Sequence, residues 1–141
     1  MKKFLIIPLM IIITSFSAVY SSEDKYIEAL RNCSSYSDFG NVNADGVNVT
    51  SHKQILGWHG DKCRYKESVN MGNMNVDILC NFSKPQIAEI TSVADAYYTT
   101  LKYSNASPDT SSIEAVQSNP IVNVFNKYLQ NPNVCTMSGM Q

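Results

Sequence analysis

Residues 53–82 read KQILGWHGDKCRYKESVNMGNMNVDILCNF, and their pattern predicts the centre of the fold. Apolar and polar side chains alternate along three runs, which are separated by the pairs Gly60-Asp61 and Met71-Gly72. Each pair places a glycine where a tight turn needs a positive φ angle. Alternation with a period of two is typical of strands that bury one face. The stretch therefore predicts a three-stranded antiparallel meander.

The two turns also predict how the strands align. They place Cys63 opposite Cys80, on a face that is almost entirely apolar. Leu56 and Trp58 are expected on the same face, opposite Tyr65 and Cys63. The side chains of the other face are mostly polar. One face would thus form the core while the other meets water.

Three helices are expected beside this sheet. Residues 22–33 repeat apolar side chains at helical spacing after acidic residues that suit a helix N-terminus. A core helix should start at Ser83, with Gln86 completing a capping box, and pack on the apolar sheet face. A C-terminal helix should start at Pro120 and stop before Asn131-Pro132. The expected fold class is α+β, as a small domain stapled by disulfides.

The chain divides into four predicted parts. Residues 1–21 join two lysines, a ten-residue apolar run and small residues, which is the layout of a secretory signal peptide. Residues 22–103 would form the α+β domain of helix, three-stranded sheet and helix. Residues 104–119 are a polar, flexible linker. Residues 120–141 supply the C-terminal helix and a tail tied back to the domain.

The predicted signal peptide has two alternative fates, cleavage and retention as an anchor. Val19 and Ser21 favour cleavage after Ser21, and Ser17 offers a second position. An uncleaved N-terminal anchor is the competing interpretation, although spanning a bilayer takes about 20 residues. Cleavage predicts an exported protein, periplasmic or secreted, and the Met-Lys-Lys start is typical of bacterial export. Only the uncleaved form would contact a membrane.

Export makes disulfide bonds the default expectation for the four cysteines, which are Cys33, Cys63, Cys80 and Cys135. Four cysteines allow three pairings, and the sequence alone does not choose among them. The predicted strand register favours Cys63 with Cys80, which leaves Cys33 with Cys135. No two cysteines have the C-x-x-C spacing of thiol oxidoreductases.

Charge and motif content argue against several functions. The chain has 11 basic and 12 acidic residues, and loss of residues 1–21 would remove two lysines, so a nucleic-acid partner is not expected. No G-x-S-x-G motif is present. His59, Asp61 and Cys63 are close in sequence, but a zinc site needs three or four converging ligands. No catalytic residue, metal site or cofactor is predicted.

Aromatic side chains are the remaining candidates for ligand or partner contact. Trp58, Leu56, Tyr65 and Tyr97 would surround a pocket between the core helix and the sheet, and Tyr98 would lie beside it. The alternative is that these side chains simply pack in the core, as most aromatic side chains do.

The expected function is that of an exported accessory protein, more a binding protein than an enzyme, whose partner is a protein or a component of the cell envelope. A small-molecule carrier with a pocket between core helix and sheet is the alternative. A secreted hydrolase of unrecognised type is the third possibility.

Overall fold

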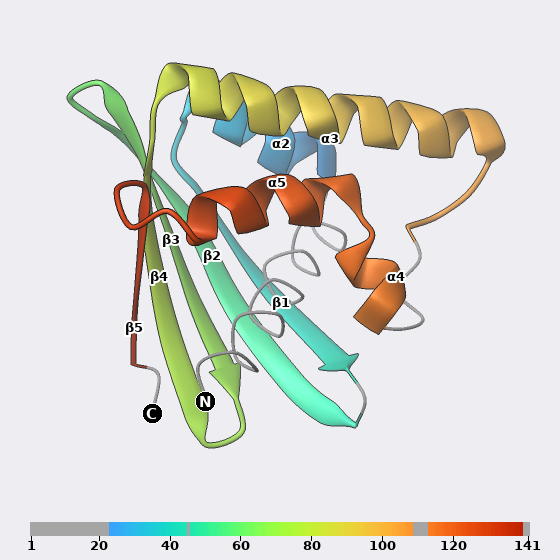
Figure 1. Cartoon of the computed structure of the whole chain (residues 1–141), viewed down its shortest axis with the longest axis horizontal. Coiled ribbons are helices and arrows are strands. Elements are labelled where there is room, and N and C mark those ends of the chain that lie inside the picture. The colour runs from blue at the N-terminus through green and yellow to red at the C-terminus, as the bar shows by residue number, and fades with distance from the viewer. Residues whose placement is uncertain (1–22, 45, 109–112, 140–141) are drawn as a thin grey trace.

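The computed structural model describes residues 23–44, 46–108 and 113–139 (Figure 1). The predicted signal peptide, residues 1–21, lies outside the described residues, as do its alternative cleavage positions. Five strands form one antiparallel sheet in the order β1-β2-β3-β4-β5. Their bounds are β1 Tyr36–Ala44, β2 Val47–His59, β3 Lys62–Met71, β4 Met74–Phe82 and β5 Cys135–Ser138.

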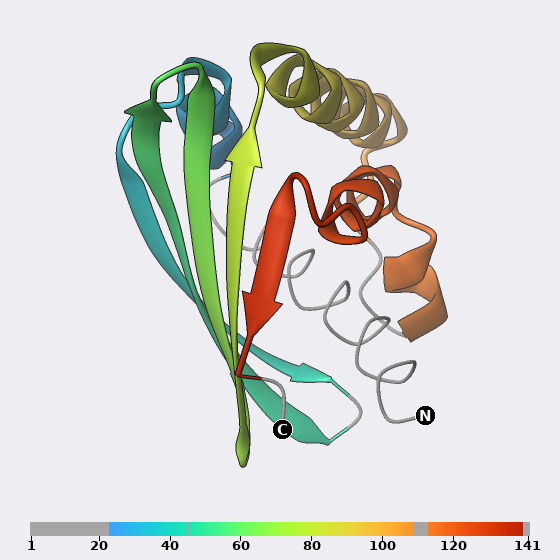
Figure 2. The same cartoon turned by 60° about the vertical axis from the view of Figure 1, so that its left-hand side comes forward.

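Helices cover one face of this sheet (Figure 2). They are α2 Glu23–Asn32, α3 Lys84–Ser104, α4 Ile113–Gln117 and α5 Pro120–Leu129. The Tyr26 ring of α2 contacts Tyr36 of β1, and Phe125 of α5 contacts Tyr65 of β3. Because Tyr36 and Tyr65 both flank Ile55 in the sheet, the two helices lie on the same face. The predicted α+β class is confirmed.

The predicted meander forms the middle of the sheet, but the predicted strand count is too low. β1 and β5 add one strand at each edge. The β1 sequence YSDFGNVNA is rich in residues typical of loops, and it is held in the sheet by nine residue pairs with β2. β5 has four residues and pairs with β4. β5 depends on a partner far away in the chain, and β1 depends on β2 to hold a sequence with little strand preference of its own.

The register of β3 and β4 differs from the prediction by two residues. The turn is Gly72-Asn73, so Cys63 lies opposite Phe82 while Cys80 lies opposite Tyr65. Because side chains alternate between faces with a period of two, this shift leaves each of them on its predicted face. The predicted apposition of Cys63 with Cys80 is wrong.

All four cysteines form disulfides, as predicted, but the favoured pairing is wrong. The bonds are Cys33–Cys63, with 5.8 Å between the Cα atoms, and Cys80–Cys135, with 4.1 Å. The end of α2 brings Cys33 to β3, and β5 places Cys135 directly opposite Cys80. Because β5 was not predicted, there was no reason in the sequence to place Cys135 beside Cys80.

Strand β2 contains a β-bulge that moves one predicted core residue to the surface. The register shifts between Ile55 and Gly57, and Gly57 has a φ angle of 93°. Ile55 therefore lies opposite Tyr65, where Leu56 was expected, and the Leu56 side chain is exposed. Trp58 keeps its predicted partner on β3. The bulge inserts a residue that breaks simple alternation.

The predicted starts of α3 and α5 are confirmed. Ser83 and Gln86 form the capping box of α3, and Asn119 caps α5 before Pro120. The expected linker, residues 104–119, contains the short helix α4, and its residues 109–112 lie outside the described part of the chain. Among the described helices, none is both long enough and apolar enough to cross a bilayer.

Candidate functional site

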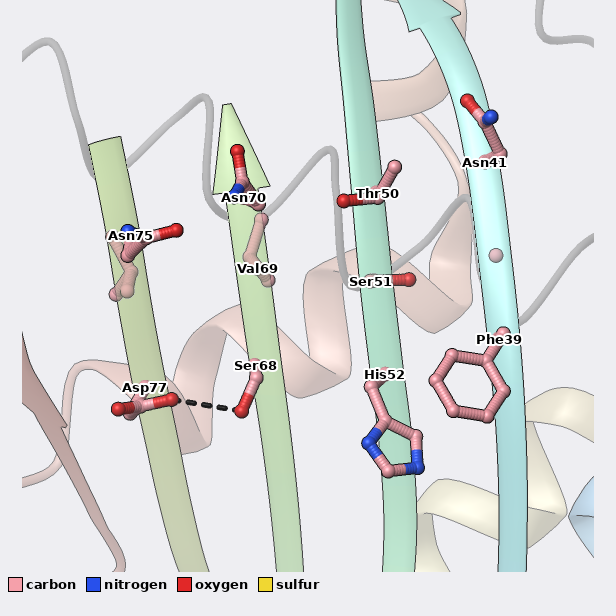
Figure 3. Close-up of a pocket in the computed structure, with 12 residues that line it drawn as sticks. Phe39, Asn41, Thr50, Ser51, His52, Ser68, Val69, Asn70, Asn75 and Asp77 are labelled. Atoms are coloured by element: carbon pink, nitrogen blue, oxygen red, sulfur yellow. Dashed lines mark hydrogen bonds between the residues drawn. The ribbon is translucent and has the colours of Figure 1, made fainter. Parts of the chain in front are cut away.

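The sheet face opposite the helices carries a hollow of about 640 Å³. Its side chains form two rows that cross strands β1 to β4 (Figure 3). The first row is Phe39, His52, Ser68 and Asp77, and the second row is Asn41, Thr50, Asn70 and Asn75. We call the surface formed by these two rows the outer trough.

An aromatic pair with one exposed ring stands at one end of the first row. The Phe39 and His52 rings are stacked, with their centres 4.1 Å apart and their planes 6° apart. His52 is held in turn by a 2.7 Å hydrogen bond between its Nε2 atom and the Ser37 hydroxyl group. Phe39 is nonetheless 76% exposed. A large apolar ring is thus displayed to solvent in a supported orientation.

His52, Ser68 and Asp77 have the composition of a catalytic triad but not its geometry. In a triad the histidine lies between the carboxylate and the serine and accepts the serine proton. Here the Ser68 hydroxyl group donates directly to Asp77 over 2.8 Å (Figure 3), and the Nε2 atom of His52 bonds to Ser37. These three side chains are therefore not linked in the order of a catalytic triad.

The second row offers uncharged hydrogen-bonding groups. Asn41, Asn70 and Asn75 are exposed, and their amide groups form no hydrogen bond within the described part of the chain. Each amide can both donate and accept. The trough lining contains no lysine or arginine, and Asp77 is its one carboxylate. This surface therefore suits a polar, uncharged ligand.

Sequence reasoning missed the outer trough. None of its residues belongs to a recognisable motif, and β1, which supplies Phe39 and Asn41, was not predicted as a strand. The available signal was the apolar Phe39 within the polar segment of residues 36–44. That residue becomes informative only when the pairing of β1 with β2 places it beside His52.

A second hollow, of about 450 Å³, is lined by residues of α2, α3 and the end of β2, and we call it the Trp58 groove. Its principal lining residues are Arg31, Trp58, Lys84, Ile87, Thr91 and Asp95. The Trp58 ring is 40% exposed, and the Lys84 Nζ atom lies 5.7 Å from its centre. Arg31 donates two hydrogen bonds to Asp95, of 2.8 and 2.7 Å.

The five predicted contact residues do not converge on one pocket. Trp58 lines the groove, whereas Leu56 is exposed at the bulge of β2. Tyr65 is buried in the core, and Tyr97 packs against the core while partly exposed. Tyr98 lines a neighbouring hollow of about 240 Å³ along α2 and α3. Of the five predicted contact residues, Trp58 alone lines the groove beside α3.

A charged side chain lies inside the core, away from both hollows. Lys53 is fully buried, with its Nζ atom 3.8 Å from the centre of the Tyr26 ring. It sits opposite Glu67, which accepts a 2.6 Å hydrogen bond from the Tyr65 hydroxyl group. Burial lowers the pKa of Lys53 to about 8, although Glu67 and Asp38 oppose this effect. Burial also raises the pKa values of Tyr26 and Tyr65.

Metal ligands do not gather in the described ranges. No group of three or more His, Cys, Asp or Glu side chains there is placed to hold a metal ion. His59 and Asp61 are exposed at the β2–β3 turn, and Cys63 is bonded to Cys33.

The outer trough and the Trp58 groove are thus defined by their own geometry and chemistry. When the chain is compared with protein-family models, with curated proteins and with solved structures, none of them matches it.

Proposed function

We propose that this protein is an exported accessory protein that binds a protein or a cell-envelope component through the outer trough and catalyses no reaction. The observation that carries the proposal is the exposed Phe39 ring, stacked on His52 beside a hollow lined by polar side chains. Two disulfides support export, because such bonds persist in oxidising compartments.

The dimensions of the trough also favour binding. Ligand sites are typically hollows of roughly 300–1,000 Å³, with a few placed polar groups. Aromatic side chains that pack against a partner supply much of the free energy of association. Phe39 is one of two large side chains more than 70% exposed among the described hydrophobic residues, the other being Tyr103 at 90%.

The test compares two substitutions of exposed aromatic side chains. The oxidised protein is mixed with cell envelopes isolated from the producing organism, and the bound fraction is measured after sedimentation. We expect Phe39→Ala to weaken retention about tenfold, the equivalent of about 1.4 kcal/mol. Tyr103→Ala, which removes an exposed ring from α3, should leave retention unchanged. Equal retention of Phe39→Ala and the unaltered protein contradicts the proposal.

A small-molecule carrier is the second candidate, and the Trp58 groove favours it. Trp58 is the single tryptophan of the chain, so a ligand that enters this groove should quench or shift its fluorescence. Trp58 shares the inner sheet face with its partner Cys63, whereas the outer trough lies on the opposite face. A ligand bound in the outer trough should leave Trp58 emission unchanged, which separates the two candidates.

A further inference from the structure

The outer trough presents an aromatic platform that is oriented before any ligand arrives. The Phe39 ring is backed by the parallel His52 ring, and Ser37 holds His52 from the side. Flat aromatic rings stack on the C–H faces of pyranose sugars, and a platform that is already ordered loses little entropy on binding. Phe39 therefore has the exposure and support that sugar stacking requires.

The polar side chains beside this platform match the hydroxyl groups of a sugar. Each sugar hydroxyl group both donates and accepts hydrogen bonds, and so do the amide groups of Asn41, Asn70 and Asn75. Asp77 adds a carboxylate acceptor, which Ser68 holds by a 2.8 Å hydrogen bond. Figure 3 shows these side chains projecting from neighbouring strands on the same side as Phe39 and His52.

The charge of the trough lining and the length of the trough narrow the class of ligand further. Phosphate groups and acidic polymers need basic partners, and the trough lining offers one carboxylate and no lysine or arginine. The two rows cross four strands, which at about 4.8 Å between strands gives a length of roughly 14 Å. That length accommodates consecutive sugar rings of a chain better than one small molecule.

From these observations we propose that the outer trough binds an uncharged glycan chain, with Phe39 stacking on one sugar ring and the asparagine row binding hydroxyl groups. This inference rests on the proposed binding function of the same face and names its ligand class. The glycan would be a component of the envelope or of an exported glycoconjugate.

Maltotetraose, cellotetraose and N-acetylchitotetraose are suitable probes, each titrated into the oxidised, isotope-labelled protein and followed by NMR. We expect at least one probe to shift amide signals of β1 to β4 around Phe39 and Asn70. Phe39→Ala should weaken that binding about tenfold, and Asn70→Ala should weaken it severalfold. Tyr103→Ala is the matched control and should change nothing. The amide spectrum of each variant reports whether it remains folded.

Two outcomes overturn the glycan inference. One is that no probe shifts the trough signals, and the other is that binding survives Phe39→Ala unchanged. If Phe39→Ala still lowers envelope retention while no sugar binds, the proposed binding function stands and the glycan class is wrong. If neither envelopes nor sugars bind in a Phe39-dependent way, both proposals fail.

Discussion

Lys53 shows how a single residue can determine the electrostatics of the core. An unpaired buried ammonium group is costly, and it persists only where neighbouring groups compensate. Here the compensation comes from the Tyr26 ring and from Glu67 on the adjacent strand. The Nζ atom forms no hydrogen bond within the described residues, so the compensation is incomplete. Stability should therefore respond to the protonation state of this lysine.

We predict that the free energy of unfolding rises with pH between about 8 and 10. Folding lowers the pKa of Lys53 from 10.5 to about 8, so the unfolded chain binds more protons in this window. The whole difference in the pKa of Lys53 between the unfolded and folded chain corresponds to about 3 kcal/mol in the free energy of unfolding. Above about pH 10 the trend should reverse, because burial raises the pKa values of Tyr26 and Tyr65 and the unfolded tyrosines ionise first.

Urea unfolding between pH 6 and 11 measures this profile. Lys53→Met keeps the length of the side chain and removes the charge, so it should abolish the rise below pH 10 and retain the fall above it. The prediction is wrong if the free energy of unfolding of the unaltered protein stays constant from pH 7 to 10. The charge of Lys53 would then be compensated more fully than its surroundings indicate.

At the scale of elements, helices and edge strands differ in what holds them. α3 begins with a capping box. The Ser83 hydroxyl oxygen accepts a hydrogen bond from the Gln86 backbone N–H group, and the Gln86 side-chain oxygen accepts one from the Ser83 backbone N–H group. β1, by contrast, is a strand because β2 supplies its hydrogen-bonding partners. The capping box was recognised in the sequence, whereas the edge strands β1 and β5 were not.

Removing the Ser83 cap should destabilise the protein by about 1 kcal/mol, because loss of the hydroxyl group leaves a helix N–H group without its acceptor. Ser83→Ala tests this in urea unfolding monitored by circular dichroism. Ser92→Ala is the control, since Ser92 is an exposed residue in the middle of the same helix. Equal effects of the two substitutions would argue against the capping contribution.

At the scale of the whole molecule, the two disulfides join its separate parts. Cys33–Cys63 ties α2 to β3 across 30 residues, and Cys80–Cys135 ties the last strand to β4 across 55 residues. Between them they connect both ends of the described chain to the middle of the sheet. The domain therefore does not depend on its core alone to keep its terminal elements in place.

Non-reducing peptide mapping should recover one linked pair of peptides containing Cys33 and Cys63 and another containing Cys80 and Cys135. Replacing either pair by serines should lower the free energy of unfolding by about 4 kcal/mol, with a slightly larger loss for the longer loop. The unfolding midpoints of the two double variants measure this. A recovered Cys63–Cys80 link would contradict the observed strand register.

Features that depend on near neighbours in the chain were predicted from the sequence. Alternation and turn glycines in residues 53–82 identified β3, β4 and the second half of β2, and the faces of the β3 and β4 side chains; the β2 bulge moved Leu56 off its predicted face. The Ser83–Gln86 capping box and Pro120 marked the starts of α3 and α5. These signals are local because each depends on residues within a turn or two of one another.

The sequence did not predict the edge strands, the register of β4, the disulfide pairing or the outer trough. β5 and the disulfides depend on contacts between segments far apart in the chain. The pairings of β1 with β2 and of β3 with β4 join consecutive strands, but the packing of the whole sheet sets their extent and register. Phe39 and His52 are 13 positions apart and become a stacked pair only through the pairing of β1 with β2. The trough itself joins side chains from four strands. The four strands pair in chain order, but which side chains stand next to one another depends on the register that the whole sheet adopts.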